Sequence, residues 1–410
     1  MPILVDKHIL LGVTGSIAAY KAADLASKLT QAGALVDVIL TPSAEKFITP
    51  LTFQSVTGRR AYTDADLWGS EAHILHVGLG HSADLLVVAP CTANTLAKLA
   101  HGEADSLLAV TALAARCPLL IAPAMESNMY AHPATQENLA KLTERGAYIA
   151  GPAEGHLASG QSGRGRMLET SEVLGHIRLV LGQRGLLAAK KVVITAGGTQ
   201  EPLDPVRVLT NRSSGKQGYA LAQAAIDAGA QVCLITTVNL TPPVGARVVE
   251  VHTAQEMLEA VLAEVATADA LVMAAAVADF RPKNVAESKM KKKDGIPRIE
   301  LEATPDILGT VSSISLGAGA GLGPGKKRPR VVVGFAAESR DLLENATIKL
   351  QSKKLDIIAA NDISATDAGF SVDTNRVTLL YADGKSEALP LMSKSEVAEI
   401  LLVRIAALLE

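Results

Sequence analysis

The chain has 410 residues, which is too long for one ordinary domain and predicts two or three. It is 48% hydrophobic but only 3% aromatic and contains 33 glycines, a composition that favours α/β architecture over an aromatic-rich β-sandwich. The formal net charge of −3 excludes a basic field for nucleic acid or anionic lipid, so any phosphate site must be local.

The first half alternates apolar runs with helical spacing. The run 8–13 ends in the glycine turn Gly12-Val-Thr-Gly15, after which Ser16 is predicted to cap a helix that Gly33 stops. Further strands are expected at 36–40, 84–90, 118–125 and 147–151, with helices around 93–101, 105–115 and 134–145. This alternation predicts a parallel sheet covered on both faces.

The second half repeats this order after a pause near 180–190. Strands are expected at 191–198, 231–237, 247–251, 270–280, 331–338, 356–362 and 377–381, with helices at 216–228, 255–266 and 395–409. The lysine-rich stretch 281–295 and the glycine-rich stretch 315–330 are expected to be loops. We therefore predict an α/β chain with two doubly wound, mostly parallel sheets, divided into domains 1–182 and 191–410 by a linker at 183–190.

Cysteine usage and the amino terminus bear on the compartment. Cys91, Cys117 and Cys233 are odd in number and widely spaced, which excludes a disulfide framework and a CxxC metal site and predicts reduced thiols packed in a core. The start of the chain lacks the pattern of a signal peptide, and no uncharged apolar stretch reaches about 18 residues. A cytoplasmic protein is expected.

Polar residues follow several predicted strands, and in an open α/β sheet ligands bind at those carboxyl ends. Gly15 and Ser16 offer backbone N–H groups and a hydroxyl to a phosphate, although the same pattern serves plain turn-and-cap chemistry. No acidic residue ends the next strand, which disfavours NAD. Two strands end in Ala-Pro and lead into the polar runs 91–95 and 126–129, a repetition that helix capping alone does not explain.

These runs carry a resemblance to the homo-oligomeric flavin-containing cysteine decarboxylases. PCTANT (90–95) resembles their PxSANT motif, PAMESNM (123–129) their PAMNxxM motif, and Ala72-His73-Ile74 their active-site histidine segment. The resemblance implies a flavodoxin-like or Rossmann-like domain with FMN between subunits. It also implies that the flavin oxidises a cysteine thiol to a thioaldehyde, that the carboxylate then leaves, and that the reduced flavin returns the hydride. His73 becomes the base, although by itself it would be an ordinary loop histidine. The implied FMN residues are Gly15, Ser16, Thr41, Ser43, Thr92 and Asn94.

Two positions depart from the decarboxylase pattern. The asparagine that holds the substrate carboxylate is Glu126 here, and because carboxylates repel, Glu126 is expected to be protonated, turned aside or paired. Asn128, beside Met129, is the candidate substitute. The flap at 157–167 carries Ser159 in place of a cysteine proton donor, and a hydroxyl is a far weaker acid than a thiol. Either another group or water supplies the proton, or the step is slow.

The second half resembles phosphopantothenate–cysteine ligase in residues 194–218, 274–280, 289–292 and 355–362. Together the halves resemble the bifunctional bacterial phosphopantothenoylcysteine decarboxylase/phosphopantothenate–cysteine ligase. The resemblance implies a Rossmann-like ligase domain in which CTP, with Mg²⁺, activates 4′-phosphopantothenate as an acyl-cytidylate that cysteine attacks. It also implies trimers joined by dimers into a homododecamer, without nucleic-acid or membrane partners.

The ligase residues carry over from the same motifs. Asn211 is expected to support the acyl intermediate, and Arg207 with the loop 213–216 to meet substrate or phosphate, although a helix-capping loop explains all but Arg207. Lys289 would clamp the triphosphate, whereas lysine runs are usually solvated surface. Asp279 ends an apolar strand, so its carboxylate would be buried and need a partner such as a cytosine amino group. The implied nucleotide residues are Ala275, Asp279, Lys289, Pro305, Asp306, Ile307, Leu308, Phe335, Lys349 and Lys353.

Two other functions stay open. Glu126 and Ser159 allow a ligase fused to a flavin-binding but catalytically decayed regulatory or scaffold domain, a reading that His73 and the complete flavin edge oppose. A decarboxylase of peptide carboxyl-terminal cysteine also fits the first half, but the attached ligase favours coenzyme A synthesis. The residues alone do not distinguish CTP from ATP, and they identify no metal ligands.

Overall fold

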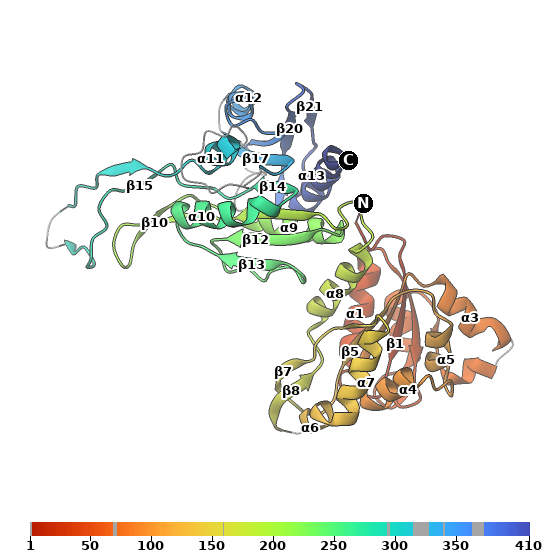
Figure 1. Cartoon of the computed structure of the whole chain (residues 1–410). Coiled ribbons are helices and arrows are strands. Elements are labelled where there is room, and N and C mark those ends of the chain that lie inside the picture. The colour runs from red at the N-terminus through yellow and green to blue at the C-terminus, as the bar shows by residue number, and fades with distance from the viewer. Residues whose placement is uncertain are drawn as a thin grey trace. The chain divides into compact units, whose positions relative to one another are not determined.

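The computed structural model of the chain describes residues 2–68, 72–158, 160–292, 296–314, 328–338, 341–362 and 373–410. The chain divides into two compact units, Met1–Leu181 and Gly182–Glu410, each with its own sheet (Figure 1). Among the helices in these ranges, none is both long enough and apolar enough to cross a membrane.

The first unit contains β1 (His8–Val13), α1 (Ala19–Gln31), β2 (Leu35–Leu40), η1 (Ala44–Lys46), α2 (Pro50–Thr57), β3 (Ala61–Tyr62), η2 (Asp64–Trp68), α3 (Ala72–Ser82), β4 (Leu85–Cys91), α4 (Ala93–His101), α5 (Leu107–Ala114), β5 (Leu119–Pro123), α6 (Ser127–Ala131), α7 (Pro133–Glu144), β6 (Tyr148–Ile149), β7 (Ala153–His156), β8 (Ser162–Arg166) and α8 (Thr170–Gly182).

The first unit is built on a parallel sheet in the order β3-β2-β1-β4-β5-β6. Successive residues of β1 enter two different buried clusters: Ile9 and Leu11 join one, and Leu10 joins the other. Helices α1, α2 and α8 cover the first face, and α3, α4, α5 and α7 cover the second. Both faces of the sheet are buried, which confirms the predicted doubly wound architecture. The antiparallel hairpin β7–β8 stands apart from this sheet.

The second unit contains β9 (Lys191–Ala196), β10 (Gln200–Pro202), β11 (Val208–Thr210), α9 (Lys216–Asp227), β12 (Gln231–Thr236), β13 (Arg247–Glu250), α10 (Ala254–Glu264), η3 (Val265–Thr267), β14 (Ala270–Met273), β15 (Phe280–Pro282), β16 (Leu301–Ala303), α11 (Ile307–Ile314), β17 (Val331–Glu338), α12 (Leu342–Ser352), β18 (Ile357–Asp362), β19 (Thr374–Asn375), β20 (Val377–Tyr381), β21 (Ser386–Ala388), β22 (Met392–Ser393) and α13 (Lys394–Leu409).

The second unit repeats the plan of the first and extends it. Its sheet runs β13-β12-β9-β14-β17-β18-β20-β21, with the first six strands parallel and the last two antiparallel. Helices α10, α11 and α12 share a buried cluster with one face of the sheet, while α9 and α13 pack on each other and on the sheet. The hairpins β10–β11 and β15–β16 lie against each other and project from the sheet as an arm (Figure 1).

Several predicted elements differ from the structure. The strand expected over 270–280 ends at Met273, because the following small residues form a loop instead. The strand expected over 147–151 is reduced to β6. Helix α8 and the hairpin β7–β8 lie where no element was predicted. Of the loop expected at 315–330, residues 315–327 lie outside the described residues, as do 293–295 of the lysine-rich stretch. Cys91 and Cys233 are buried free thiols as expected, whereas Cys117 is only half-buried.

Candidate functional sites

In the first unit, a cavity of about 450 Å³ opens beside the carboxyl ends of β1, β4 and β5. Its walls are mostly apolar, and the hairpin β7–β8 closes one side. The residues that line it are Gly15, Ser16, Ile17, Ala18, Tyr20, Lys21, Thr92, Ala93, Ala124, Met125, Glu126, Met129, His156, Leu157, Ala158, Gly165, Arg166 and Met167.

A buried threonine joins the two turns at the floor of this cavity. The Thr14 hydroxyl donates to the carbonyl of Pro90 at 2.7 Å and accepts from the amide of Thr92 at 3.1 Å. Thr14 therefore fixes the turn after β1 against the turn after β4. Thr14 was not predicted to have this role, although a hydroxyl inside a glycine turn was the available signal.

Three of the predicted FMN residues, Gly15, Ser16 and Thr92, line the cavity. Thr41 and Ser43 do not line it, but Ser43 lies against Gly15: a Cβ on Gly15 would stand 2.4 Å from Cβ of Ser43, so glycine allows this close approach. Asn94 is exposed in the first turn of α4 and does not line the cavity.

The expected cap of the first helix is wrong in detail. The hydroxyl of Ser16 accepts from the amide of Ala18 at 3.2 Å, but the helix begins only at Ala19. Ser16 therefore shapes the turn before α1, and it lines the cavity there.

The Glu126 carboxylate was expected to be protonated, turned aside or paired, and in the structure it is paired with hydrogen-bond donors. As the N-cap of α6 its carboxylate accepts from the amides of Asn128 at 2.7 Å and Met129 at 3.3 Å, and from the Asn128 side chain at 3.3 Å. A carboxylate at a helix N-terminus is stabilised by these amides and by the helix dipole. Met129 lines the cavity together with Glu126, whereas Asn128 does not.

Lys21 is a buried cation that was not predicted from the sequence. Its ammonium donates to the carbonyls of Met167 at 3.1 Å and Leu168 at 3.4 Å and pairs with Glu169 at 3.0 Å. This bond to Lys21 holds the pKa of the Glu169 carboxyl below its ordinary value despite opposing desolvation. Lys21 thus ties α1 to the segment that follows the flap strand β8. Its signal was a lysine on the apolar face of the first helix.

The other two predicted decarboxylase residues cannot be examined in the same way. His73 is the second residue of α3, but its side chain lies outside the described residues. Ser159, which comes between β7 and β8 in the sequence, also lies outside them.

We predict that Glu126→Ala lowers the free energy of unfolding by about 0.5–2 kcal/mol, because the cap of α6 is lost. Glu126→Asn should cost less, since asparagine retains an acceptor for the same amides. Urea unfolding checks this, with Glu154→Ala, an exposed carboxylate of β7, as the matched control. Equal stability of wild type and Glu126→Ala would contradict the capping role.

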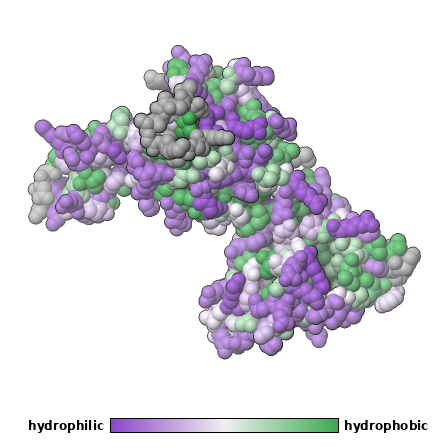
Figure 2. Space-filling model, in the orientation of Figure 1, coloured by the Kyte–Doolittle hydropathy of each residue, from purple (hydrophilic) through white to green (hydrophobic). Residues whose placement is uncertain are grey.

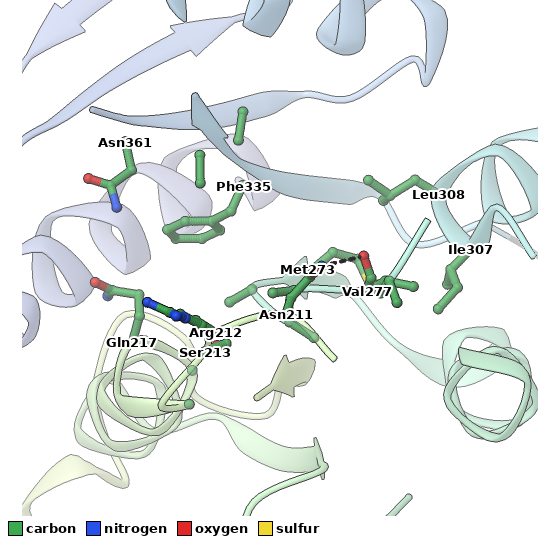
Figure 3. Close-up of a pocket in the computed structure, with 18 of the residues that line it drawn as sticks. Asn211, Arg212, Ser213, Gln217, Met273, Val277, Ile307, Leu308, Phe335 and Asn361 are labelled. Carbon is green, nitrogen blue, oxygen red and sulfur yellow. Dashed lines mark hydrogen bonds between the residues drawn. The ribbon is translucent and has the colours of Figure 1, made fainter. Parts of the chain in front are cut away.

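In the second unit, a larger cavity of about 700 Å³ lies at the carboxyl ends of β14, β17 and β18 (Figure 3). Most of the predicted ligase residues converge on it. Those that line it are Asn211, Ala275, Asp279, Pro305, Asp306, Ile307, Leu308, Phe335, Lys349 and Lys353, together with the predicted phosphate loop from Ser213 to Lys216.

Two buried threonines hold the loop after β14 in place. The Thr195 hydroxyl accepts from the amide of Ala275 at 3.1 Å, and the Thr199 hydroxyl accepts from the amide of Ala278 at 2.9 Å. The loop therefore presents its backbone to the cavity. This corrects the expectation for Asp279: because the strand ends earlier, its carboxylate is exposed at the cavity wall and needs no buried partner.

Asn211 reaches the same loop from the opposite wall. Its side-chain N–H group donates to the carbonyl of Val277 at 3.1 Å (Figure 3). This bond fixes the orientation of the Asn211 side chain against the loop after β14.

Asp306 sits among cations at another part of the cavity. Its carboxylate forms an ion pair with Lys353 and accepts from the amide of Gly309 at 2.9 Å, and Lys349 donates to the carbonyl of Phe335 at 3.0 Å. Burial disfavours the Asp306 charge, but Lys353, the Gly309 amide and Lys349 together hold the pKa of Asp306 below its ordinary value.

Arg207 and Lys289 do not line the cavity. Arg207 instead pairs with Asp204, which is only 2% exposed and also accepts from the amides of Val206 and Arg207, both at 2.8 Å. The amide of Met290 donates to the same carboxylate at 3.1 Å, so the chain beside Lys289 is anchored there while Lys289 itself is exposed. The position of Arg207, which a helix-capping loop did not explain, is thus explained by a buried carboxylate three residues away.

No cluster of three or more His, Cys, Asp or Glu side chains suited to a metal ion occurs in the described parts of the chain.

We predict that Lys353→Met destabilises the protein above the ordinary Asp pKa of 3.8, where Asp306 is charged. Because the folded-state pKa of Asp306 is lowered, the stabilisation is present above the unfolded pKa and is lost as pH falls through the folded one. Urea unfolding between pH 3 and 7 measures this. In an Asp306→Asn background Lys353→Met should have little effect; the same loss there would show that the lysine stabilises through other contacts.

Comparison with known proteins identifies the family of each half of the chain. Residues 4–182 match the family described as Flavoprotein, and residues 187–409 match the DNA/pantothenate metabolism flavoprotein C-terminal domain. The coenzyme A biosynthesis bifunctional protein CoaBC of Bacillus subtilis (strain 168) is 46% identical over 407 residues, covering 98% of this chain and 97% of the relative.

The chain belongs to the family of bifunctional coenzyme A biosynthesis proteins. The expected class is confirmed: an enzyme of coenzyme A biosynthesis that joins a flavoprotein decarboxylase half to a ligase half.

Two solved structures each match one half. The C-terminal domain of a coenzyme A biosynthesis bifunctional protein CoaBC is 39% identical, with a TM-score of 0.45, and covers 55% of this chain and 98% of its own. A PPC decarboxylase mutant complexed with pantothenoylaminoethenethiol is also 39% identical, with a TM-score of 0.40, and covers 42% of this chain and 97% of its own.

Proposed function

We propose that residues 191–410 join cysteine to 4′-phosphopantothenate with CTP, that residues 1–182 then decarboxylate 4′-phosphopantothenoylcysteine to 4′-phosphopantetheine with FMN, and that 183–190 link the two. The observation that carries this proposal is the convergence of residues far apart in the sequence on one cavity. Of the nucleotide residues inferred from the ligase resemblance, all except Lys289 line the cavity of about 700 Å³.

Each wall of that cavity has a role in the proposed ligation. The backbone of the loop 274–279, held by Thr195 and Thr199, meets the nucleotide base. Lys349 and Lys353 carry the charge that a triphosphate requires. Asn211, a neutral amide donor beside this loop, stabilises the developing oxyanion of the acyl transfer. Mg²⁺ enters with the phosphates, since this ion is commonly bound through substrate oxygens.

The residues of the smaller cavity fit FMN. Apolar walls suit the flavin ring, while Ser16 and the turn before α1 supply polar groups for its phosphate. When bound, FMN would supply the reversible two-electron chemistry that makes the carboxylate a leaving group. His73 takes the thiol proton, and Glu126 and Met129, which line the cavity, form the substrate edge with Asn128 next to them in the chain. Ser159 belongs to the flap segment between β7 and β8.

Self-association is part of the proposal. Large apolar side chains are exposed on both units, including Tyr20, Leu51 and Trp68 in the first, with Trp68 86% exposed. The arm of the second unit exposes Val206 and Phe280, and Figure 2 shows hydrophobic residues among hydrophilic ones there. Such surfaces suit subunit contacts. We propose a cytoplasmic homododecamer of trimers joined by dimers, whose size analytical ultracentrifugation of the full chain would measure.

We predict that the two half-reactions separate by mutation. His73→Asn should abolish release of carbon dioxide from phosphopantothenoylcysteine and leave release of pyrophosphate from CTP intact. Asn211→Asp should impair ligation while decarboxylation continues, and Lys289→Gln should slow formation of the acyl-cytidylate. Assays of both products on each full-length variant check this. Loss of both activities in any one variant would point to misfolding, and near-normal ligation by Lys289→Gln would make this lysine ordinary surface.

Variants of Ser159, compared with wild type, test whether the first half is a decarboxylase or a decayed flavin-binding domain. If the flap residue delivers the proton, Ser159→Cys should equal or exceed wild type in the reductive step, since a thiol pKa of about 8.5 is far nearer neutrality than that of an alcohol. Ser159→Ala should be mildly impaired. The measurement is the ratio of enethiol to pantetheine product. A wild-type protein that binds FMN but releases no carbon dioxide would favour the decayed domain instead.

A further inference from the structure

The hairpin strand β8 and the short helix α6 lie against each other beside the cavity of the first unit (Figure 1). Both elements contribute to that cavity: Gly165 and Arg166 belong to β8, Met129 belongs to α6, and Glu126 is the N-cap of α6. The distance between β8 and α6 therefore sets the width of the cavity at the edge where we place the substrate.

Two glycines bring the backbone of β8 close to the start of α6. A Cβ on Gly165 would stand 2.3 Å from the carbonyl oxygen of Met125, and a Cβ on Gly163 would stand 2.4 Å from Oγ of Ser127. A backbone oxygen at that distance leaves no room for a side chain at residue 165, so only glycine permits the approach. The amide of Met125 donates to the carbonyl of Gly165 at 3.0 Å. This bond joins β8 to the residue before the cap of α6.

The residue between these glycines, Arg164, contacts an aromatic ring of α6. Its guanidinium carbon lies 5.4 Å from the centroid of the Tyr130 ring, which is within the range of a cation–π interaction. Tyr130 packs in turn against the buried cluster on the second face of the sheet. Since the core fixes the ring, the interaction with Arg164 attaches the hairpin to the core of the first unit.

The two arginines of β8 hold different parts of the strand. Arg166 pairs with Glu169, which also pairs with the buried Lys21, and these contacts fix the end at which the chain leaves the hairpin. Arg164 lies two residues nearer the segment between β7 and β8. Among the described residues no ion pair involves Arg164, so the face of Tyr130 is the partner that holds its side chain.

We propose that Arg164 and Tyr130 act together as positioning residues of the decarboxylase half. Neither residue lines the cavity, so both act through the walls that they join. Their interaction holds β8 at a fixed distance from α6, and it thereby places Glu126 and Met129 relative to β8 before the substrate binds. Without it, part of the binding energy of the substrate is used to order the hairpin, and the substrate binds more weakly. The proposal rests on decarboxylation by this half and adds two residues that do not contact the substrate in this cavity.

The test is a double-mutant cycle on the full-length protein, measured by release of carbon dioxide from phosphopantothenoylcysteine. Arg164→Met and Tyr130→Leu should each raise KM about two- to fivefold, the effect of losing one exposed cation–π interaction. The kcat should not change, because the interaction is the same in the ground state and the transition state. The double variant should show no larger effect than either single variant. Tyr130→Phe keeps an aromatic face and should match wild type, as should Arg116→Met, which removes an exposed arginine of the same unit that does not line the cavity.

Hydrogen exchange tests the positioning role without relying on activity. The amide of Met125, which is bonded to Gly165, should exchange faster in Arg164→Met than in wild type, while the amides of β1 in the centre of the sheet exchange as before. If Tyr130→Leu fails to fold, Arg164→Met carries the test through KM and exchange. Unchanged exchange at Met125, unchanged KM in Arg164→Met, or effects on KM that multiply in the double variant would overturn the proposal. A wild-type protein that releases no carbon dioxide would refute the decarboxylase function, and faster exchange in Arg164→Met would still support the positioning role.

Discussion

A parallel sheet that is buried on both faces leaves its side chains only one place to meet a ligand, the ends of its strands. Both units of this protein obey that constraint. Along β4 every residue is buried, and the polar residues begin where the strand ends, at Thr92. Along β14 every residue is buried as well, and the loop that lines the ligase cavity begins directly after Met273. The chemistry of each half depends on how those strand ends are held.

In both units a threonine hydroxyl holds these strand ends in place. A threonine at the end of the first strand of each unit turns its hydroxyl toward the backbone that leaves the neighbouring strand: Thr14 binds the amide of Thr92, and Thr195 binds the amide of Ala275. The strands concerned, β1 with β4 and β9 with β14, are parallel neighbours at the centre of their sheets. A buried hydroxyl in this position satisfies a backbone N–H that the sheet no longer serves. The two cavities are thus built on the same arrangement of a threonine hydroxyl and a backbone amide.

The sequence predicted the sheets well because apolar runs between turns have few alternatives in a chain of this length. The prediction was wrong where an apolar run continues beyond the end of a strand, because composition does not show where the backbone leaves the sheet. The run 270–280 is almost wholly apolar, yet the strand β14 covers only Ala270–Met273. For that reason the prediction that the Asp279 carboxylate is buried was wrong. Small residues such as Ala274–Ala276 suit a cavity wall as well as a strand interior. The partners of Glu126 and Arg207 could not be predicted either, since both depend on local turns that bring a carboxylate to backbone amides.

Buried lysines show why composition and burial alone do not identify a binding site. Lys21 and Lys394 are nearly equally buried, at 5% and 6% exposed, and each lines the cavity of its own unit. Lys21 meets two carbonyls and a carboxylate, so the protein itself supplies what the charge needs, and the lysine acts as a tie between α1 and the base of the flap. Lys394 begins α13 instead, and its pKa is lowered first by burial and then by the charge of Lys216, against the opposing effect of Asp373. Equal burial therefore does not establish equal electrostatic surroundings, and the role of each buried lysine has to be argued from its own contacts.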